Sequence, residues 1–298
     1  MTAPGMRSAP PFPQPGHPAP SPKASAQALN VLAALLEART GQQIVRHRST
    51  RVDTVLLPLM RERRLETLDQ LVLAILDGSD PSLAGRVVDA LVNCETSFFR
   101  DPQIFDLIAD TVAAIERTGR RARIWSVGCS TGQEPLSIAM ALAERNDALG
   151  TAMPDIVATD VSEAALAKAR AGSFTQFEVQ RGLPIRHLVR WFEGRADNEW
   201  VVRPELLRHI AFRHMNLVSD PPPPGGFDLI LCRNVMLYFA PEAKRRVFDI
   251  LASAMRPGAG LILGAGETVI GQTALFRLSP GGRGLYEKIP EEEAPRTA

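Results

Sequence analysis

Apolar residues recur at intervals of three and four over residues 26–92, in four runs separated by polar stretches. This period places the apolar side chains on one face of each of four helices. Thr67 and Gln70 have the spacing of a capping box at the third helix, and Asp80 and Pro81 are expected to cap and begin the fourth. Each helix is too short to be stable alone. The pattern therefore predicts an all-helical domain at 26–92.

After residue 101, short apolar runs alternate with helical patterns. The expected strands are 123–127, 155–159, 210–213, 227–232 and 260–263, and the expected helices are 101–117, 134–144, 162–171 and 241–255. This alternation predicts a parallel sheet with helices on both faces, in a domain that spans 93–289. Two last runs, 275–278 and 284–289, flank a Pro-Gly-Gly turn and predict a terminal antiparallel hairpin.

Three segments do not follow this alternation of strands and helices. Residues 173–210 are more than one crossover needs, and their aromatic and β-branched runs around a polar loop predict a small β-rich insert. Residues 1–25 contain eight prolines and few large apolar side chains, so we expect a disordered tail. A loose tail is expected at 290–298.

Composition excludes several classes of protein. The formal net charge of +1 gives no global attraction to nucleic acid, and no apolar run reaches the roughly 20 residues that span a bilayer. The three cysteines, Cys94, Cys129 and Cys232, lie far apart and suggest neither a disulfide framework nor a metal site. We expect a cytoplasmic protein, a monomer, with no metal and no membrane insertion.

A local basic cluster lies in the helical region. It is either a solvated helix face or a docking surface for an acidic protein, and the sequence alone favours neither. Its members are Arg39, Arg46, His47, Arg48, Arg51, Arg61, Arg63 and Arg64.

The turn after the first expected strand carries candidate chemistry. Gly128 and Gly132 stand four apart where a strand gives way to a helix, the usual place at which an α/β sheet receives a nucleotide-like ligand. The turn lacks the lysine of a phosphate loop, and Glu134 stands where a phosphate would otherwise sit. A ligand with hydroxyls or positive charge is favoured, and S-adenosylmethionine is such a ligand.

Polar residues also follow the other strands. Asp160 is either a ribose-binding acid or a helix cap, and the glycine turn before it favours ribose. The amide of Asn216 could form hydrogen bonds with the edge of an adenine, and Leu217 could pack on its face, although an Asn after a strand is more often a turn residue. Cys232, Arg233 and Tyr238 follow the fourth strand, near the mouth of the sheet or in its core.

The segment between the two regions reads Thr96-Ser-Phe-Phe-Arg100-Asp. The two phenylalanines could be simple packing beside a surface charge. An arginine held by packed aromatics can also present its planar guanidinium to a carboxylate.

In order along the chain, these motifs resemble the CheR family of chemoreceptor glutamate methyltransferases. The resemblance runs from about Leu29 to Lys288. It rests on ETSFFRD (95–101), GCSTGQEPLSIAM (128–140), ATDVS (158–162), NL (216–217), FDLILCRNVMLYF (227–239) and GAGET (264–268).

The resemblance implies a helical N-terminal domain and a Rossmann-like methyltransferase sheet with a small inserted β-subdomain. It implies that S-adenosylmethionine is the cofactor and that Arg100 and Tyr238 position a glutamate carboxylate of the substrate. The basic helical domain would recognise the acidic, helical methylation region of a chemoreceptor. The implied cofactor-pocket residues are Cys94, Thr96, Arg100, Gly128, Glu134, Asp160, Asn216, Leu217, Cys232 and Arg233.

The sequence departs from the family pattern at Cys94, at Leu136 and at Ala265-Gly266. The short loop 193–199 resembles family members that do not grip a receptor's C-terminal peptide. Two other functions fit these motifs less well. A methyltransferase for small molecules or nucleic acids would not need the SFFRD motif, and a non-catalytic adenosylmethionine-binding adapter would not need both Arg100 and Tyr238. Transfer to another acidic protein stays open.

Overall fold

The computed structural model describes residues 25–44, 49–149, 152–280 and 284–290. Nearly all of the two predicted tails, 1–25 and 290–298, lies outside these ranges. None of the helices in the described ranges combines the length and the hydropathy that a bilayer-spanning segment needs.

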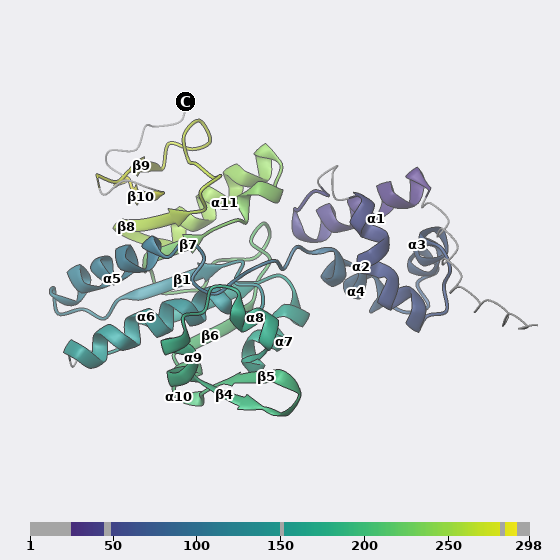
Figure 1. The fold of residues 1–298 in the computed structure, drawn as a ribbon. Helices are drawn as coiled ribbons and strands as arrows, with labels where there is room; N and C mark the ends of the chain where they lie inside the picture. Colours follow the sequence, from purple (N-terminus) through teal and green to yellow (C-terminus); the bar gives the residue numbers. More distant parts are fainter. Residues whose placement is uncertain (1–24, 45–48, 150–151, 281–283, 291–298) are drawn as a thin grey trace, which may run out of the picture.

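Four helices form a lobe beside the α/β part of the chain (Figure 1). Their apolar faces meet in a core of their own, which includes the fully buried Leu32, Leu56 and Leu71. The helices are α1 (Ala26–Thr40), α2 (Ser49–Glu62), α3 (Leu68–Asp77) and α4 (Leu83–Leu91).

The ends of two of these helices test the capping predictions. The capping box of Thr67 and Gln70 is confirmed, because each side chain meets the other residue's backbone N–H. The predicted start of α4 is wrong. Asp80 accepts hydrogen bonds from the backbone and hydroxyl of Ser82 at 2.8 and 2.6 Å, and Pro81 lies in a turn before the helix. Because of this local Asp-Ser turn, the helix begins only at Leu83.

The second part of the chain is a seven-stranded sheet in the order β6-β2-β1-β7-β8-β10-β9. The five strands from β6 to β8 are parallel, and β10 pairs antiparallel with β8 and β9. The predicted terminal hairpin is confirmed by this last pair. The strands are β1 (Arg123–Val127), β2 (Asp155–Asp160), β6 (Ile210–His214), β7 (Phe227–Cys232), β8 (Met255–Leu263), β9 (Phe276–Leu278) and β10 (Leu285–Lys288).

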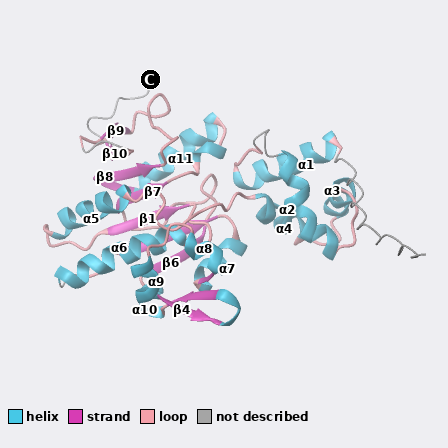
Figure 2. Ribbon diagram, in the orientation of Figure 1, coloured by secondary structure: helices cyan, strands magenta, loops and turns pink. Residues whose placement is uncertain are grey.

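Both faces of the sheet are covered by helices, as Figure 2 shows. Successive side chains of a strand point to opposite faces, so Ile124 joins one hydrophobic cluster and Trp125 the other. This explains why the strands read as continuous apolar runs. The helices are α5 (Gln103–Glu116), α6 (Gln133–Leu149), α7 (Glu163–Ala171) and α11 (Pro241–Ala254).

The predicted start of the fifth parallel strand is also wrong. The last long helix was predicted at 241–255, where the Pro257-Gly258 pair that follows looks like a helix stop, but α11 ends at Ala254 and Met255 already pairs with Phe227 in the sheet. Strand β8 therefore begins five residues before the predicted strand.

Between α7 and β6 the chain forms a second, three-stranded antiparallel sheet in the order β3-β5-β4. Phe174 and Phe192 of this sheet are buried in the cluster that also contains Ile124. The elements are β3 (Ser173–Thr175), α8 (Gln176–Gln180), α9 (Ile185–Trp191), β4 (Phe192–Arg195), a 3-10 turn (Ala196–Asn198), β5 (Glu199–Val202) and α10 (Pro204–Leu207).

Candidate active site

A pocket of about 850 Å³, counting the part open to solvent, lies at the carboxyl ends of the parallel strands. Strand β1 has β2 on one side and β7 on the other, so the strand order reverses at this point and opens a crevice. Of the predicted site residues, the pocket is lined by Thr96, Arg100, Gly128, Glu134, Asp160, Asn216, Leu217, Arg233 and Tyr238.

The other two predicted residues lie elsewhere. Cys232 is fully buried in the core behind the sheet and is not among the lining residues. Cys94 lines two neighbouring pockets, and its carbonyl accepts a hydrogen bond from the hydroxyl of Ser130 at 2.7 Å.

The glycine turn forms one wall of the pocket. Gly128 has a φ of 65°, and a Cβ there would lie 2.5 Å from Cγ2 of Val235. Both the left-handed backbone and the close approach require glycine. The turn is fixed to the next strand, because the backbone N–H of Cys129 donates to the carbonyl of Thr159 at 2.9 Å.

Asp160 ends β2 and faces the turn. One carboxylate oxygen accepts from the backbone N–H of Ser130 at 2.7 Å, and the other from Ser162 at 2.9 Å. The cap of α7 is Ser162, not Asp160. Burial raises the pKa of Asp160, and the two N–H groups oppose that rise. A carboxylate has about four lone-pair sites, so acceptor capacity remains for a ligand in the pocket.

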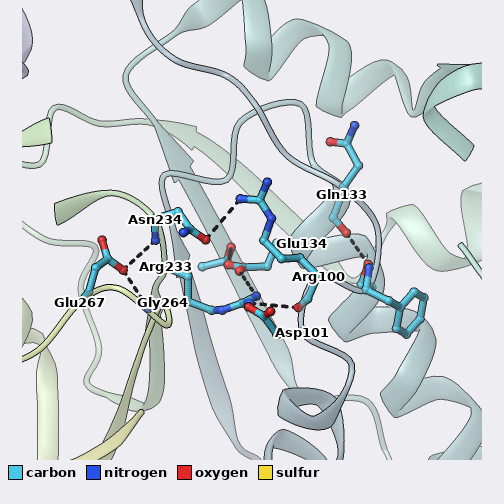
Figure 3. A network of polar contacts seen from close by, with 11 residues as sticks. Arg100, Asp101, Gln133, Glu134, Arg233, Asn234, Gly264 and Glu267 are labelled. Carbon is cyan, nitrogen blue, oxygen red and sulfur yellow. Dashed lines mark hydrogen bonds and ion pairs between the residues drawn. The ribbon is translucent and has the colours of Figure 1, made fainter. Parts of the chain in front are cut away.

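Glu134 and Arg233 form a largely buried ion pair in the wall of the pocket (Figure 3). Glu134 accepts from the hydroxyl of Ser126 at 2.8 Å and from Nη1 of Arg233 at 3.0 Å. The Arg233 side chain is 2% exposed, and its Nη2 donates to the carbonyl of Arg100 at 3.0 Å and pairs with Asp101. This network therefore ties the linker to two strands of the sheet.

The two phenylalanines before Arg100 anchor the linker. Phe98 is buried, with its ring centroid 5.1 Å from that of Phe174 and 5.8 Å from that of Phe192 in edge-on contacts. Phe99 stacks on His187 of α9 at 4.7 Å. Its φ of 45° is left-handed, an uncommon conformation that the surrounding packing holds in place.

Arg100 lies between polar partners at the pocket wall. Its Nη1 donates to Oδ1 of Asn234 at 3.2 Å, and its Nη2 pairs with Glu95. Tyr238 lies in the 3-10 turn Met236–Tyr238, and its hydroxyl accepts from Nδ2 of Asn93 at 2.6 Å. The structure thus places Arg100 and Tyr238 on one pocket.

Asn216 lines the pocket, and its side chain also has the turn role that the sequence offered as the alternative. Its Nδ2 donates to the carbonyl of Arg39 at the end of α1 at 2.7 Å, and its Oδ1 accepts from the backbone of Val218 at 3.0 Å. The amide therefore links the helical lobe to the sheet and shapes a turn. Leu217 beside it is buried and offers an apolar wall.

Sequence reasoning assigned no role to Glu267. This carboxylate is 8% exposed and accepts three backbone hydrogen bonds, from Asn234 and Met236 at 2.7 Å and from Gly264 at 2.8 Å. Figure 3 shows the bonds from Asn234 and Gly264. It fixes the loop on which Asn234 adopts a left-handed φ of 60°. The only signal in the sequence was its place in the GAGET motif.

The strand order reverses beside β1, and the glycine turn and the buried Asp160 lie at the crevice that this reversal opens. These features define the class of α/β proteins that bind a nucleotide-like ligand at such a crevice. Residues 94–284 match the family model of the CheR methyltransferase, SAM binding domain.

Three relatives cover most of the chain. A chemotaxis protein methyltransferase of Vibrio parahaemolyticus is 34% identical over 85% of this chain and 94% of its own length. Chemotaxis protein methyltransferase Cher2 of Pseudomonas putida is 33% identical over 83% and 93%. Chemotaxis protein methyltransferase 1 of Pseudomonas aeruginosa is 36% identical over 73% and 81%. The chain belongs to the CheR family of methyltransferases, as the sequence resemblance predicted.

The cofactor of this domain is S-adenosylmethionine, and the pocket fits it. Asp160 keeps acceptor capacity for the ribose hydroxyls, Gly128 lets the backbone come close, and Leu217 supplies an apolar surface for a base. With a methyltransferase family shown, the alternative of a non-catalytic adapter is not favoured.

Proposed function

We propose that the protein methylates glutamate side chains of chemoreceptors, forming γ-glutamyl methyl esters. The observation that carries this proposal is the position of Arg100, whose guanidinium lines the same pocket as the cofactor-binding candidate Asp160. A guanidinium at this place matches the planar shape and the charge of an acceptor carboxylate. The names of the relatives support a substrate in chemotaxis.

The proposed methyl transfer does not require the protein to remove a proton from the acceptor. Bound S-adenosylmethionine supplies an electrophilic methyl group. A glutamate with a pKa of about 4.3 is already ionised at neutral pH, so no general base is needed. In keeping with this, none of the described residues that line the pocket is a histidine.

Orientation is then the main contribution of the site. Holding two reactants in line can supply up to roughly 7–11 kcal/mol in favourable cases. Arg100 orients the acceptor carboxylate, and Tyr238, held by Asn93, borders the same space. Arg100 must not bind the attacking oxygen too tightly, because that would reduce its nucleophilicity.

The helical lobe is the proposed docking surface for the acidic methylation region of the receptor. Arg39, Arg61 and Arg64 are exposed, whereas Arg63 is paired with Asp80. Arg46, His47 and Arg48 lie outside the described residues, as does the side chain of Arg51. The exposed arginines would give a salt-dependent attraction to an acidic helix. The cytoplasmic location, the monomeric state and independence from a receptor's C-terminal peptide stay predictions.

The test is transfer of labelled methyl from S-adenosylmethionine to membranes in which one chemoreceptor is overproduced. Base-labile label on the receptor supports the ester, and label on another acidic protein would redirect the proposal. Arg100→Ala should lower turnover by about 100- to 1,000-fold, the usual cost of losing one transition-state donor. Arg245→Ala, at an exposed arginine of α11, is the matched control. Near-normal transfer by Arg100→Ala would refute the role of Arg100.

A further inference from the structure

A carboxylate of the protein itself already occupies Arg100. Glu95 lies five residues before Arg100 on the linker and lines the pocket. One of its oxygens pairs with Nη2 of Arg100, and the other pairs with Nη2 of Arg181 at 2.5 Å. Arg181 follows α8 in the inserted segment and lines a small adjoining pocket together with Glu95.

This contact conflicts with simple binding of the acceptor. Arg100 has one Nη on Asn234 and the other on Glu95. An acceptor carboxylate that binds both Nη groups in the bidentate manner therefore competes with the Glu95 oxygen for Nη2.

We propose that Glu95 is an internal competitor for Arg100, which the acceptor glutamate displaces and which Arg181 then retains. The inference rests on the proposed function. Glu95 can move because its side chain is 46% exposed, and it need not lose all of its pairing because the second arginine holds its other oxygen. Burial raises the pKa of Glu95, but hydrogen bonds from both arginines outweigh burial and leave the pKa below its ordinary value, so the competitor stays charged.

Competition of this kind makes the site selective for charge. An ionised glutamate can replace Glu95 at Arg100, whereas a glutamine or the methyl ester product carries no charge to offer. Glu95 then returns to Arg100 once the ester has formed, and the neutral product is disfavoured in the site. Glu95 is thus a residue that sets specificity and favours product release, in contrast to Arg100, which touches the substrate.

The experiment compares KM and kcat for the receptor in membranes at constant cofactor concentration. Partly exposed ion pairs are weak, so Glu95→Gln should lower KM about two- to fivefold and change kcat less than about twofold. Arg181→Ala should raise KM about two- to fivefold, because Glu95 then has only Arg100 as a partner. In the Glu95→Gln background, Arg181→Ala should have no further effect.

Glu242→Gln is the matched control, because Glu242 is an exposed glutamate paired with an arginine on α11. A Glu95→Gln variant with a large loss of kcat would overturn the proposal, since Glu95 would then hold Arg100 in its working position. Tighter binding of S-adenosylhomocysteine with an unchanged receptor KM would also overturn it, since Glu95 would then oppose the cofactor. If the wild-type protein transfers no methyl to receptor, the proposed function fails, whereas wild-type transfer with an unchanged KM in Glu95→Gln defeats this inference alone.

Discussion

Replacing Glu267 by glutamine should destabilise the protein and slow turnover together. The glutamine oxygen can replace only one carboxylate oxygen, and the new amide group must face a backbone N–H. If it keeps the bonds to Asn234 and Gly264, the N–H of Met236 loses its acceptor. A buried donor without a partner costs about 1–3 kcal/mol, and the two remaining bonds lose the strength that a charged acceptor gives.

These contributions together predict a loss of about 3 kcal/mol in the free energy of unfolding. For an α/β domain of about 200 residues, the melting temperature should fall by roughly 6–12 °C. Turnover should fall as well, because the loop that Glu267 fixes carries Asn234, the partner of Arg100.

Urea unfolding followed by circular dichroism measures the free energy, and labelled methyl transfer measures turnover. Glu163→Gln, at an exposed glutamate paired with Arg170, should stay within about 0.5 kcal/mol of the wild type. If Glu267→Gln also stays within that margin, the three backbone bonds do not hold the loop and the reasoning is wrong.

Three further predictions concern cofactor binding, thiol reactivity and docking. Asp160→Asn should weaken binding of S-adenosylhomocysteine in calorimetry. In the wild type, lowering the pH should weaken this binding, because the ribose hydroxyls favour the ionised form of Asp160. Since burial raises the pKa of Asp160, the loss of affinity should begin at a higher pH than the ordinary aspartate pKa of 3.8 would give. An affinity that does not change with pH would contradict this. Burial raises the pKa of Cys94 to about 12, so at pH 8 nearly all of it is the thiol, and iodoacetamide should alkylate it roughly 10- to 100-fold more slowly than an ordinary thiol, as peptide mass spectrometry can show. Charge reversal in Arg61→Glu with Arg64→Glu should raise the receptor KM and reduce its salt dependence without changing affinity for S-adenosylhomocysteine, and an unchanged KM would place docking elsewhere.

Much of the fold could be predicted because its signals are local. The strands are apolar runs, since both faces of the sheet are buried, and the carboxyl ends of parallel strands meet at one edge. Asp160 and Arg233 were therefore found from their position after strands. The boundary at Met255 was missed because Pro257-Gly258 looked like a helix stop, whereas pairing with Phe227 decided the outcome.

The contacts of the site were harder to predict because they join distant segments. The bond from Asn216 to Arg39 spans 177 positions, and Glu267 serves a loop that begins 33 positions earlier. The pairing of Glu95 with Arg181 depends on how the insert folds back on the linker. Nothing in the local pattern of charges distinguishes these residues from ordinary surface groups.

The aromatic contacts of Phe98 and Phe99 have a consequence for chimeric enzymes. Phe174, Phe192 and His187 belong to the inserted segment, yet they support the linker that carries Arg100. Grafting this segment from a relative in order to redirect receptor choice would therefore also replace the support of Arg100. A successful graft must keep these three ring positions, so evolution can vary the outer surface of the segment more freely than its inner side.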